Sequence, residues 1–377
     1  MPNLIQVRLF VTRILCLSCT LGLAACSEPP HWKFGFVGGL SGPASDLGGP
    51  ARNGMQLAIE EANANGGIRG RTIQANIKDD KQDPKLAVQM VEELLADKVD
   101  VIIGPVTSSI ALEVIPLANA AKKVMMGLTV TTSELNGLDD YFLRVLSSTD
   151  THAGYTAQKL YHKAGVRSVT CVYDLRNQSY SQGWIEAFTK RFQEIGGITK
   201  NILSFSSQNR DKLLGIADQL LEESPDMIVF VTNAVDAAML AKLVRDKDAK
   251  VKIATSEWAG TERLIELGGA HIEGAYVPQY LDRESRDLDF QRFRSAYKKR
   301  FNQEPGFPGM TGYNATHVII SALRDNPDPD SLKQTILRQK QYTGIQGEIV
   351  FDQYGDVTSN TYVTQVQNGI FRVLNNK

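Results

Sequence analysis

Two adjacent serines, Ser108 and Ser109, stand where the sequence is well suited to bind an anion. The stretch Val101–Ile110 reads Val-Ile-Ile-Gly-Pro-Val-Thr-Ser-Ser-Ile, and its β-branched apolar start is typical of a buried parallel strand. A helix is expected next, because apolar residues recur at helical spacing, at Ala111, Val114, Ile115 and Ala118. Backbone N–H groups and the positive dipole end of a helix attract an anion. A serine that only caps the helix is the alternative interpretation, and both roles fit because one serine can cap while its neighbour faces a cleft.

Other polar side chains also follow expected strands. They are Ser41, Thr129, Thr131, Thr132, Tyr180 and Glu257. In doubly wound α/β sheets, ligands bind outside the carboxyl ends of the strands. Hydroxyl groups at a helix N-terminus suit a carboxylate, and a carboxylate such as that of Glu257 suits an ammonium group in a closed cleft. The pattern predicts a site for a molecule that carries both charges.

Sequence motifs for catalysis, metals and nucleotides are absent. Neither G-x-G-x-x-G nor G-x-x-x-x-G-K-[ST] nor G-x-S-x-G occurs, although a triad distant in sequence would leave no such motif. The five histidines are dispersed, and Asp79, Asp80 and Asp83 fit a solvated turn because adjacent strand residues point to opposite faces. The net charge of −1, without a long basic run, indicates no nucleic-acid partner. We expect no metal, no cofactor and no enzymatic activity.

The elements that would position these residues alternate along the chain. At 377 residues the chain is long enough for two lobes, and the strand–helix alternation predicts an α/β fold with doubly wound, mainly parallel sheets. The first expected strands are Lys33–Leu40, Arg71–Asp79, Val124–Gly127 and Phe142–Val145. The strand–helix alternation begins again near Thr149, with strands expected at Ser168–Tyr173, Ile198–Phe205, Met227–Thr232 and Val251–Thr255. Two further helices are expected at Asp287–Phe301 and Ala315–Leu323. The tail, with turns at Gly355-Asp356 and Asn368-Gly369, predicts a hairpin added to a sheet.

The N-terminus predicts export. Arg8 and Arg13 precede the apolar segment Ile14–Ala25, which is too short to cross a bilayer comfortably. Its end, Leu-Ala-Ala-Cys, resembles a bacterial lipoprotein box, which implies cleavage before Cys26 and lipid on its thiol. A plain cleavable signal is the alternative. Residues 1–25 would then be the signal peptide and 26–32 a lipid-anchored linker, and Cys171 would remain as a packed core thiol without a disulfide partner.

Several segments together resemble the bacterial periplasmic branched-chain amino-acid-binding proteins. They are Lys33–Asp46, Ala62–Gly70, Lys78–Pro84, Ile102–Ser109, Gly344–Asp356 and Gln365–Phe371. The resemblance implies a type I periplasmic binding protein, with two Rossmann-like lobes joined by a three-stranded hinge. Lobe 1 would hold residues 31–149 and 279–345, and lobe 2 residues 150–278 and 346–377. The chain would cross between the lobes near Ser148–Thr149, Val277–Tyr280 and Ile345–Val350.

The resemblance also implies roles for single residues. Ser108, Thr129 and Thr131, with Ser109 beside them, would hold a ligand carboxylate. Tyr180 and Glu257 match the ligand-binding tyrosine and acidic residue of the second lobe, and Glu257 would pair with the ligand's ammonium group. Leu47 and Ala234 stand where members often place aromatic rings, which suggests a roomier pocket. Apolar walls are expected from Trp258, Phe307 and Tyr313, and Gln82 and Thr107 replace a disulfide pair that members often carry.

These features predict the substrate-binding component of an ABC importer. The ligand would be an amino acid with an apolar or branched side chain, bound by hinge closure and delivered to permease subunits. The protein would be a monomer, held to the extracytoplasmic face of a bacterial membrane only through its N-terminal lipid. The alternatives are a sensory ligand-binding subunit and a receptor for a non-amino-acid metabolite, such as an amide, a urea or an aromatic acid.

Overall fold

A five-stranded parallel sheet contains the first strands of the chain. The structure is a computed structural model and describes residues 31–42, 45–207 and 213–374; the signal segment and Cys26 lie outside them. The sheet order is β2-β1-β3-β4-β5, and every neighbouring pair is parallel. The strands are β1 (Trp32–Gly38), β2 (Ile73–Asp79), β3 (Val101–Ile103), β4 (Met125–Gly127) and β5 (Phe142–Arg144). This sheet confirms the alternation predicted for the first half.

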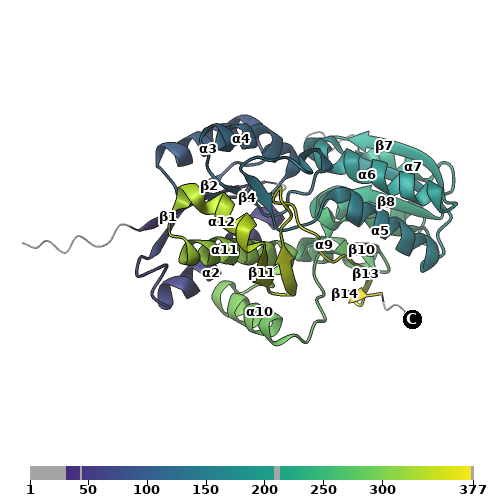
Figure 1. The fold of residues 1–377 in the computed structure, drawn as a ribbon. Helices are drawn as coiled ribbons and strands as arrows, with labels where there is room; N and C mark the ends of the chain where they lie inside the picture. Colours follow the sequence, from purple (N-terminus) through teal and green to yellow (C-terminus); the bar gives the residue numbers. More distant parts are fainter. Residues whose placement is uncertain (1–30, 43–44, 208–212, 375–377) are drawn as a thin grey trace, which may run out of the picture. The chain divides into compact units, whose positions relative to one another are not determined.

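Helices from both ends of the sequence accompany this sheet (Figure 1). From the first half come α2 (Ser45–Ala64), α3 (Pro84–Ala96) and α4 (Ser108–Ala120), and from the last third come α10 (Leu288–Phe301), α11 (Gly306–Asp325) and α12 (Leu332–Gln339). Helices α2 and α11 pack backbone to backbone. A Cβ on Gly54 would lie 2.0 Å from the Gly309 carbonyl oxygen, and one on Gly312 would lie 2.0 Å from that of Ala51. Glycine is therefore required at this crossing.

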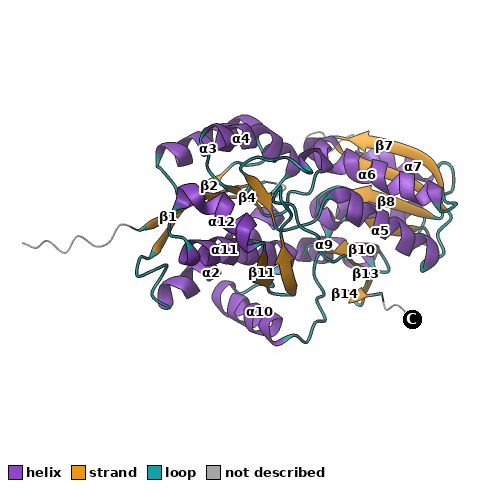
Figure 2. Ribbon diagram, viewed as in Figure 1, coloured by secondary structure: helices purple, strands orange, loops and turns teal. Residues whose placement is uncertain are grey.

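The second sheet has seven strands in the order β14-β13-β10-β9-β8-β6-β7. Strands β6 (Ser168–Asp174), β7 (Ile198–Phe205), β8 (Met227–Val231), β9 (Lys252–Thr255) and β10 (Tyr276–Gln279) run parallel. The tail forms the expected hairpin of β13 (Tyr362–Gln367) and β14 (Ile370–Val373), which adds antiparallel to β10. The accompanying helices are α5 (Thr149–His162), α6 (Gln178–Glu194), α7 (Leu213–Leu221), α8 (Ala234–Lys247) and α9 (Glu262–Gly268) (Figure 2).

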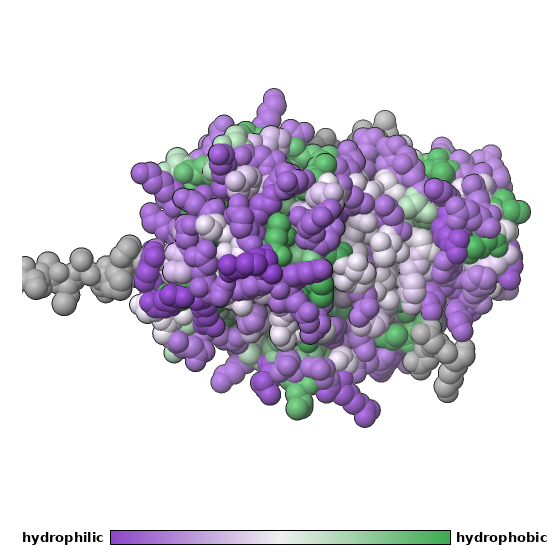
Figure 3. Space-filling view, in the orientation of Figure 1, coloured by the Kyte–Doolittle hydropathy of each residue, from purple (hydrophilic) through white to green (hydrophobic). Residues whose placement is uncertain are grey.

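Burial follows the layers. The central strands are wholly apolar and inaccessible, as in β3 and β8, because helices cover parallel sheets on both faces. Figure 3 shows a mostly hydrophilic face, with apolar side chains scattered over it. No helix among the described residues is long and apolar enough to cross a membrane.

Two expectations about the C-terminal third are wrong in detail. The crossing expected at Ile345–Val350 is the turn and second strand of a hairpin, β11 (Gln341–Gly344) with β12 (Gly347–Val350), and the chain joins the seven-stranded sheet only at β13. Helix α11 begins at Gly306, well before the expected Ala315. Its first seven residues include three glycines and a proline, which disfavour a helix, and packing against α2 overrides that preference.

Candidate ligand-binding site

A small cavity lies where the carboxyl ends of strands from the two sheets meet. Its volume is about 20 Å³, roughly enough for one water, so a larger occupant requires the lining residues to move apart. The lining residues are Leu47, Val106, Thr129, Asn177, Tyr180, Trp258, Tyr280 and Phe307. Most of them follow β3, β4, β6, β9 and β10 or begin helices. The site therefore lies at the strand ends, as expected for a doubly wound sheet.

Glu257 is the buried charge beside this cavity. It begins a short 3-10 helix after β9 and has no exposed surface. Its Oε2 accepts hydrogen bonds from the Tyr180 hydroxyl at 3.1 Å and from the Trp184 indole N–H at 2.8 Å. Its Oε1 has no hydrogen-bond partner among the described residues. Burial raises the pKa of the Glu257 carboxyl to about 7, although the Trp184 and Tyr180 hydrogen bonds act in the opposite direction.

This arrangement leaves the Glu257 carboxylate ready for a cation. An ionised carboxylate taken out of water is costly unless it is paired. Tyr180 and Trp184 satisfy only one oxygen, and both donors are neutral. A cationic group that reached Oε1 would complete the hydrogen bonding and balance the charge.

Of the hydroxyl residues expected to hold a ligand carboxylate, Thr129 lines the cavity, and Ser108, Ser109 and Thr131 lie outside its lining. Thr129 lines it and donates its hydroxyl hydrogen bond to the Val106 carbonyl. Ser108 is the first residue of α4, but the N-cap position belongs to Thr107, so Ser108 is not the cap. The Ser108 hydroxyl accepts instead from the backbone N–H of Thr131 at 3.4 Å and from that of Thr132 at 3.3 Å.

Thr131 is fully buried and is tied to the start of α5. Its carbonyl oxygen accepts from the Thr149 backbone N–H at 2.7 Å, and its hydroxyl accepts from the Thr149 hydroxyl at 3.1 Å. Thr131 is therefore connected to the first expected crossing between the lobes. Its proposed contact with a ligand carboxylate stays a prediction.

Ser109 lies at a contact between the two lobes. Its backbone N–H donates to the Asn177 side-chain oxygen at 3.0 Å, and its hydroxyl lies 3.3 Å from that of Ser179. The helix N-terminus that was expected to meet an anion therefore meets a side-chain amide at this position. This contact joins α4 to the start of α6.

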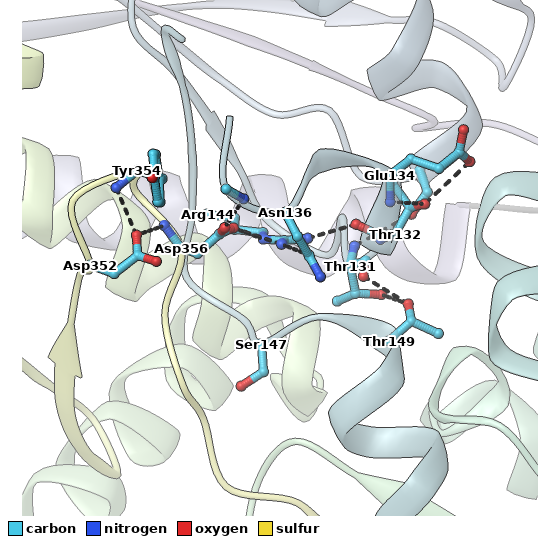
Figure 4. Close-up of polar contacts among 12 residues, drawn as sticks. Thr131, Thr132, Glu134, Asn136, Arg144, Ser147, Thr149, Asp352, Tyr354 and Asp356 are labelled. Carbon is cyan, nitrogen blue, oxygen red and sulfur yellow. Dashed lines mark hydrogen bonds and ion pairs between the residues drawn. The ribbon is translucent and has the colours of Figure 1, made fainter. Parts of the chain in front are cut away.

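Arg144 holds the loop that carries the threonines (Figure 4). It lies on β5 with 1% exposure. Its guanidinium donates to the Thr132 carbonyl at 2.9 Å, to the Asn136 side-chain oxygen, and to Asp356 Oδ1 at 2.6 Å. The other Asp356 oxygen accepts from the Gly137 backbone N–H at 2.8 Å. One buried cation thus fixes the loop after β4 to the segment that leads into β13.

Comparisons with known proteins agree with this architecture. The periplasmic binding protein family model matches residues 31–370. The chain belongs to the periplasmic binding protein family. The Leu/Ile/Val-binding protein BraC3 of Rhizobium johnstonii is 22% identical over 87% of this chain and 89% of its own length.

Solved structures support the fold of this periplasmic binding protein. The branched-chain amino acid transporter substrate-binding protein LivJ from Streptococcus pneumoniae, in complex with isoleucine, superimposes with a TM-score of 0.85, at 20% identity over 92% of this chain and 99% of that chain. A solute-binding protein from R. palustris in complex with benzoate gives 0.82, at 16% identity over 92% of this chain and 96% of that chain. The two-lobed type I fold predicted from the sequence is confirmed, and the two neighbours differ in their ligands.

The expected apolar walls of this periplasmic binding protein are partly in place. Leu47, Trp258 and Phe307 line the cavity. Tyr313 does not; its hydroxyl donates to Glu61 at 2.6 Å in another part of the first lobe. Ala234 does not line it either, because it begins α8 and packs in a separate core of the second lobe. Residue type and position in the sequence do not fix the direction of a side chain, so neither position could be placed at the cavity in advance.

Several residues at the site were not predicted from the sequence. Asn177 and Tyr280 line the cavity, and Trp184 holds Glu257. Asn177 and Trp184 lie close to Tyr180 in the sequence, and Tyr280 directly follows β10. A search around the expected strand ends and along the first turns of α6 would have included all three.

Proposed function

We propose that this protein is the substrate-binding component of an ABC importer and binds an amino acid with a compact apolar side chain between its lobes. The proposal is carried by Oε1 of the buried Glu257, which has no hydrogen-bond partner in the part of the chain that the structure describes. This oxygen can accept a hydrogen bond from a cation. The α-ammonium group of an amino acid is a cation of the right size for a single carboxylate oxygen.

The cavity walls support an apolar side chain. Leu47, Val106 and Phe307 provide apolar surface, and the rings of Tyr180 and Trp258 meet edge to face at 5.9 Å. Burying apolar area against such walls favours binding by about 25 cal/mol per Å². The relatives named as Leu/Ile/Val-binding proteins are consistent with this ligand class.

The ligand carboxylate would be held on the other lobe. Thr129 already lines the cavity, and Ser108 and Thr131 lie outside its present lining. A ligand that touches Glu257 with its cation and these hydroxyls with its anion would contact both lobes at once. Such a ligand favours the closed arrangement because it binds that arrangement more tightly.

An aromatic acid is the second candidate, because a structural neighbour was solved in complex with benzoate. A ligand without a cation would leave Glu257 unpaired when ionised. It would therefore bind best when Glu257 is protonated, below about pH 7. The two candidates thus predict opposite dependences on pH.

A ligand screen tests the proposal. Unfolding temperatures of the purified protein would be measured at pH 8 with each L-amino acid and with benzoate, because a ligand that binds only the native state raises the unfolding temperature. We expect a rise with an apolar L-amino acid that disappears in Glu257→Gln, while Asp80→Asn, a buried carboxyl outside the cavity lining, retains it. A response to benzoate alone would contradict the proposal.

The transport role and the lipid anchor at the N-terminus are tested separately from ligand binding. We propose that lipid on Cys26 holds the protein at the extracytoplasmic face of the membrane, as a monomer that delivers its ligand to permease subunits. Loss of uptake of the identified ligand in a deletion strain would support import. Unchanged uptake with a lost transcriptional response to the ligand would indicate the sensory alternative.

A further inference from the structure

Tyr280 separates the ligand cavity from a second, larger cavity. It follows β10, is 7% exposed, and lines both spaces. The second space, here named the hinge cavity, has a volume of about 190 Å³. Its lining includes Tyr280, Asn314, Gln346, Glu348, Asn360 and Tyr362. Tyr280 is thus the residue that the two linings share.

The Tyr280 ring is held in place on several sides. The His152 ring meets it edge to face at 4.6 Å between centroids, and the Phe307 ring does so at 5.1 Å. Rotating the ring away would break these contacts together, so the wall is a fixed feature of the site.

The two cavities differ in chemistry as well as in size. Leu47, Val106 and Phe307 make one side of the ligand cavity apolar. The hinge cavity carries many polar side chains, among them Asn314 and Glu348. A ligand side chain that extended past Tyr280 would leave apolar walls and enter a polar space.

We propose that Tyr280 sets the upper size limit of the ligand by closing the ligand cavity against the hinge cavity. The inference rests on the proposed function for the identity of the ligand, and it deepens that function by assigning a specificity-determining residue. The natural ligand then has a compact apolar side chain. Replacing the ring with a smaller side chain joins the two cavities and admits a longer ligand with a polar end.

Calorimetric titration of four proteins tests the proposal. The wild type, Tyr280→Phe, Tyr280→Leu and Tyr280→Ala would each be titrated with L-leucine, L-phenylalanine and L-tyrosine. We expect the ratio of affinities for L-tyrosine and L-leucine to rise at least tenfold in the Leu and Ala variants. The Phe variant keeps the ring, so its ratio should stay within twofold of the wild-type value.

A matched control separates the size limit from general loosening of the fold. Tyr342 is also buried, at 5% exposure, packs edge to face on Phe351 and lines neither cavity. Tyr342→Leu should lower the unfolding temperature without changing the affinity ratio. An unchanged ratio in a folded Tyr280→Leu protein overturns the proposal, as does an equal change in Tyr342→Leu.

The outcome stays distinct from that of the proposed function. If the wild type binds none of the three amino acids, the proposed function is wrong, and the same proteins are titrated with benzoate and with the longer 3-(4-hydroxyphenyl)propanoate. A gain for the longer acid in Tyr280→Leu supports the size limit for this other ligand class. No gain for any longer probe overturns it.

Discussion

Replacing Glu257 by glutamine should stabilise the ligand-free protein at pH 8 and remove its affinity for a cationic ligand. Glutamine keeps an oxygen that accepts from Tyr180 and Trp184 but carries no charge. The wild-type side chain has an ordinary pKa of 4.5, and burial raises it to about 7. At about 1.4 kcal/mol per pKa unit, this difference in pKa corresponds to about 3 kcal/mol in the free energy of unfolding.

The sign follows from proton binding. Between pH 4.5 and about 7 the folded protein retains the Glu257 proton that the unfolded chain has released. This carboxyl therefore makes its full contribution to stability below pH 4.5, and the contribution is lost as the pH rises through about 7. A bound ammonium group would reverse the loss, because it stabilises the ionised form. Ligand affinity should accordingly increase from pH 5 to pH 8.

The assay is urea unfolding of the ligand-free wild type and Glu257→Gln at pH 5 and pH 8. We expect the variant to gain up to about 3 kcal/mol relative to the wild type between the two pH values. Asp80→Asn is the matched control, because burial raises the pKa of Asp80 to about 6 and this residue does not line the cavity. It should show a smaller gain in stability, about 1.4 kcal/mol, because only the interval from pH 5 to about 6 contributes, and it should keep ligand binding. Equal pH dependence in the wild type and Glu257→Gln would refute the reasoning.

Three further predictions concern other parts of the chain. Arg144→Lys should lower the free energy of unfolding by about 3 kcal/mol, since lysine cannot replace a buried guanidinium that joins separate segments. In the same urea experiment the exposed Arg292→Lys should change the free energy of unfolding by less than about 0.5 kcal/mol. Equal losses in the two variants would contradict the role of Arg144 in joining these segments. Burial lowers the pKa of His152 to about 3, so its ring should stay neutral at pH 5 in an NMR titration, and its contribution to stability should decline as the pH falls below 6.5; a midpoint above pH 5 would show the burial argument to be wrong. Cys26→Ser should abolish labelling by radioactive palmitate and release the protein from the membrane fraction, whereas persistent labelling would argue against lipidation at this thiol.

The helices and strands that lead to the site could be predicted because their signals are local. The apolar run at β3 and the helical stripe of α4 predict both elements within a few residues. Helix α11 shows the limit of such signals. Its Gly- and Pro-rich first turns resemble a loop, and only contact with Gly54 and Ala51 on α2 makes them helical.

The candidate site divides in the same way. Ser109, Thr129, Tyr180 and Glu257 could be selected because polar side chains after buried strands are recognisable in sequence. Their partners could not. Tyr180 and Glu257 are 77 residues apart, and Ser109 and Asn177 are 68 apart, so no local pattern links them.

The sequence by itself determined the alternating strands and helices, the parallel sheets that follow from them, and the edge at which polar residues gather. These depend on periodicity and on residue type, which are properties of short segments. Only the tertiary structure decided that no described residue bonds to the second oxygen of Glu257, that Arg144 fixes the threonine loop, and that Tyr280 lies between two cavities. Burial and hydrogen bonding between distant segments arise only when the chain has folded, and they set the charge and the shape of the site.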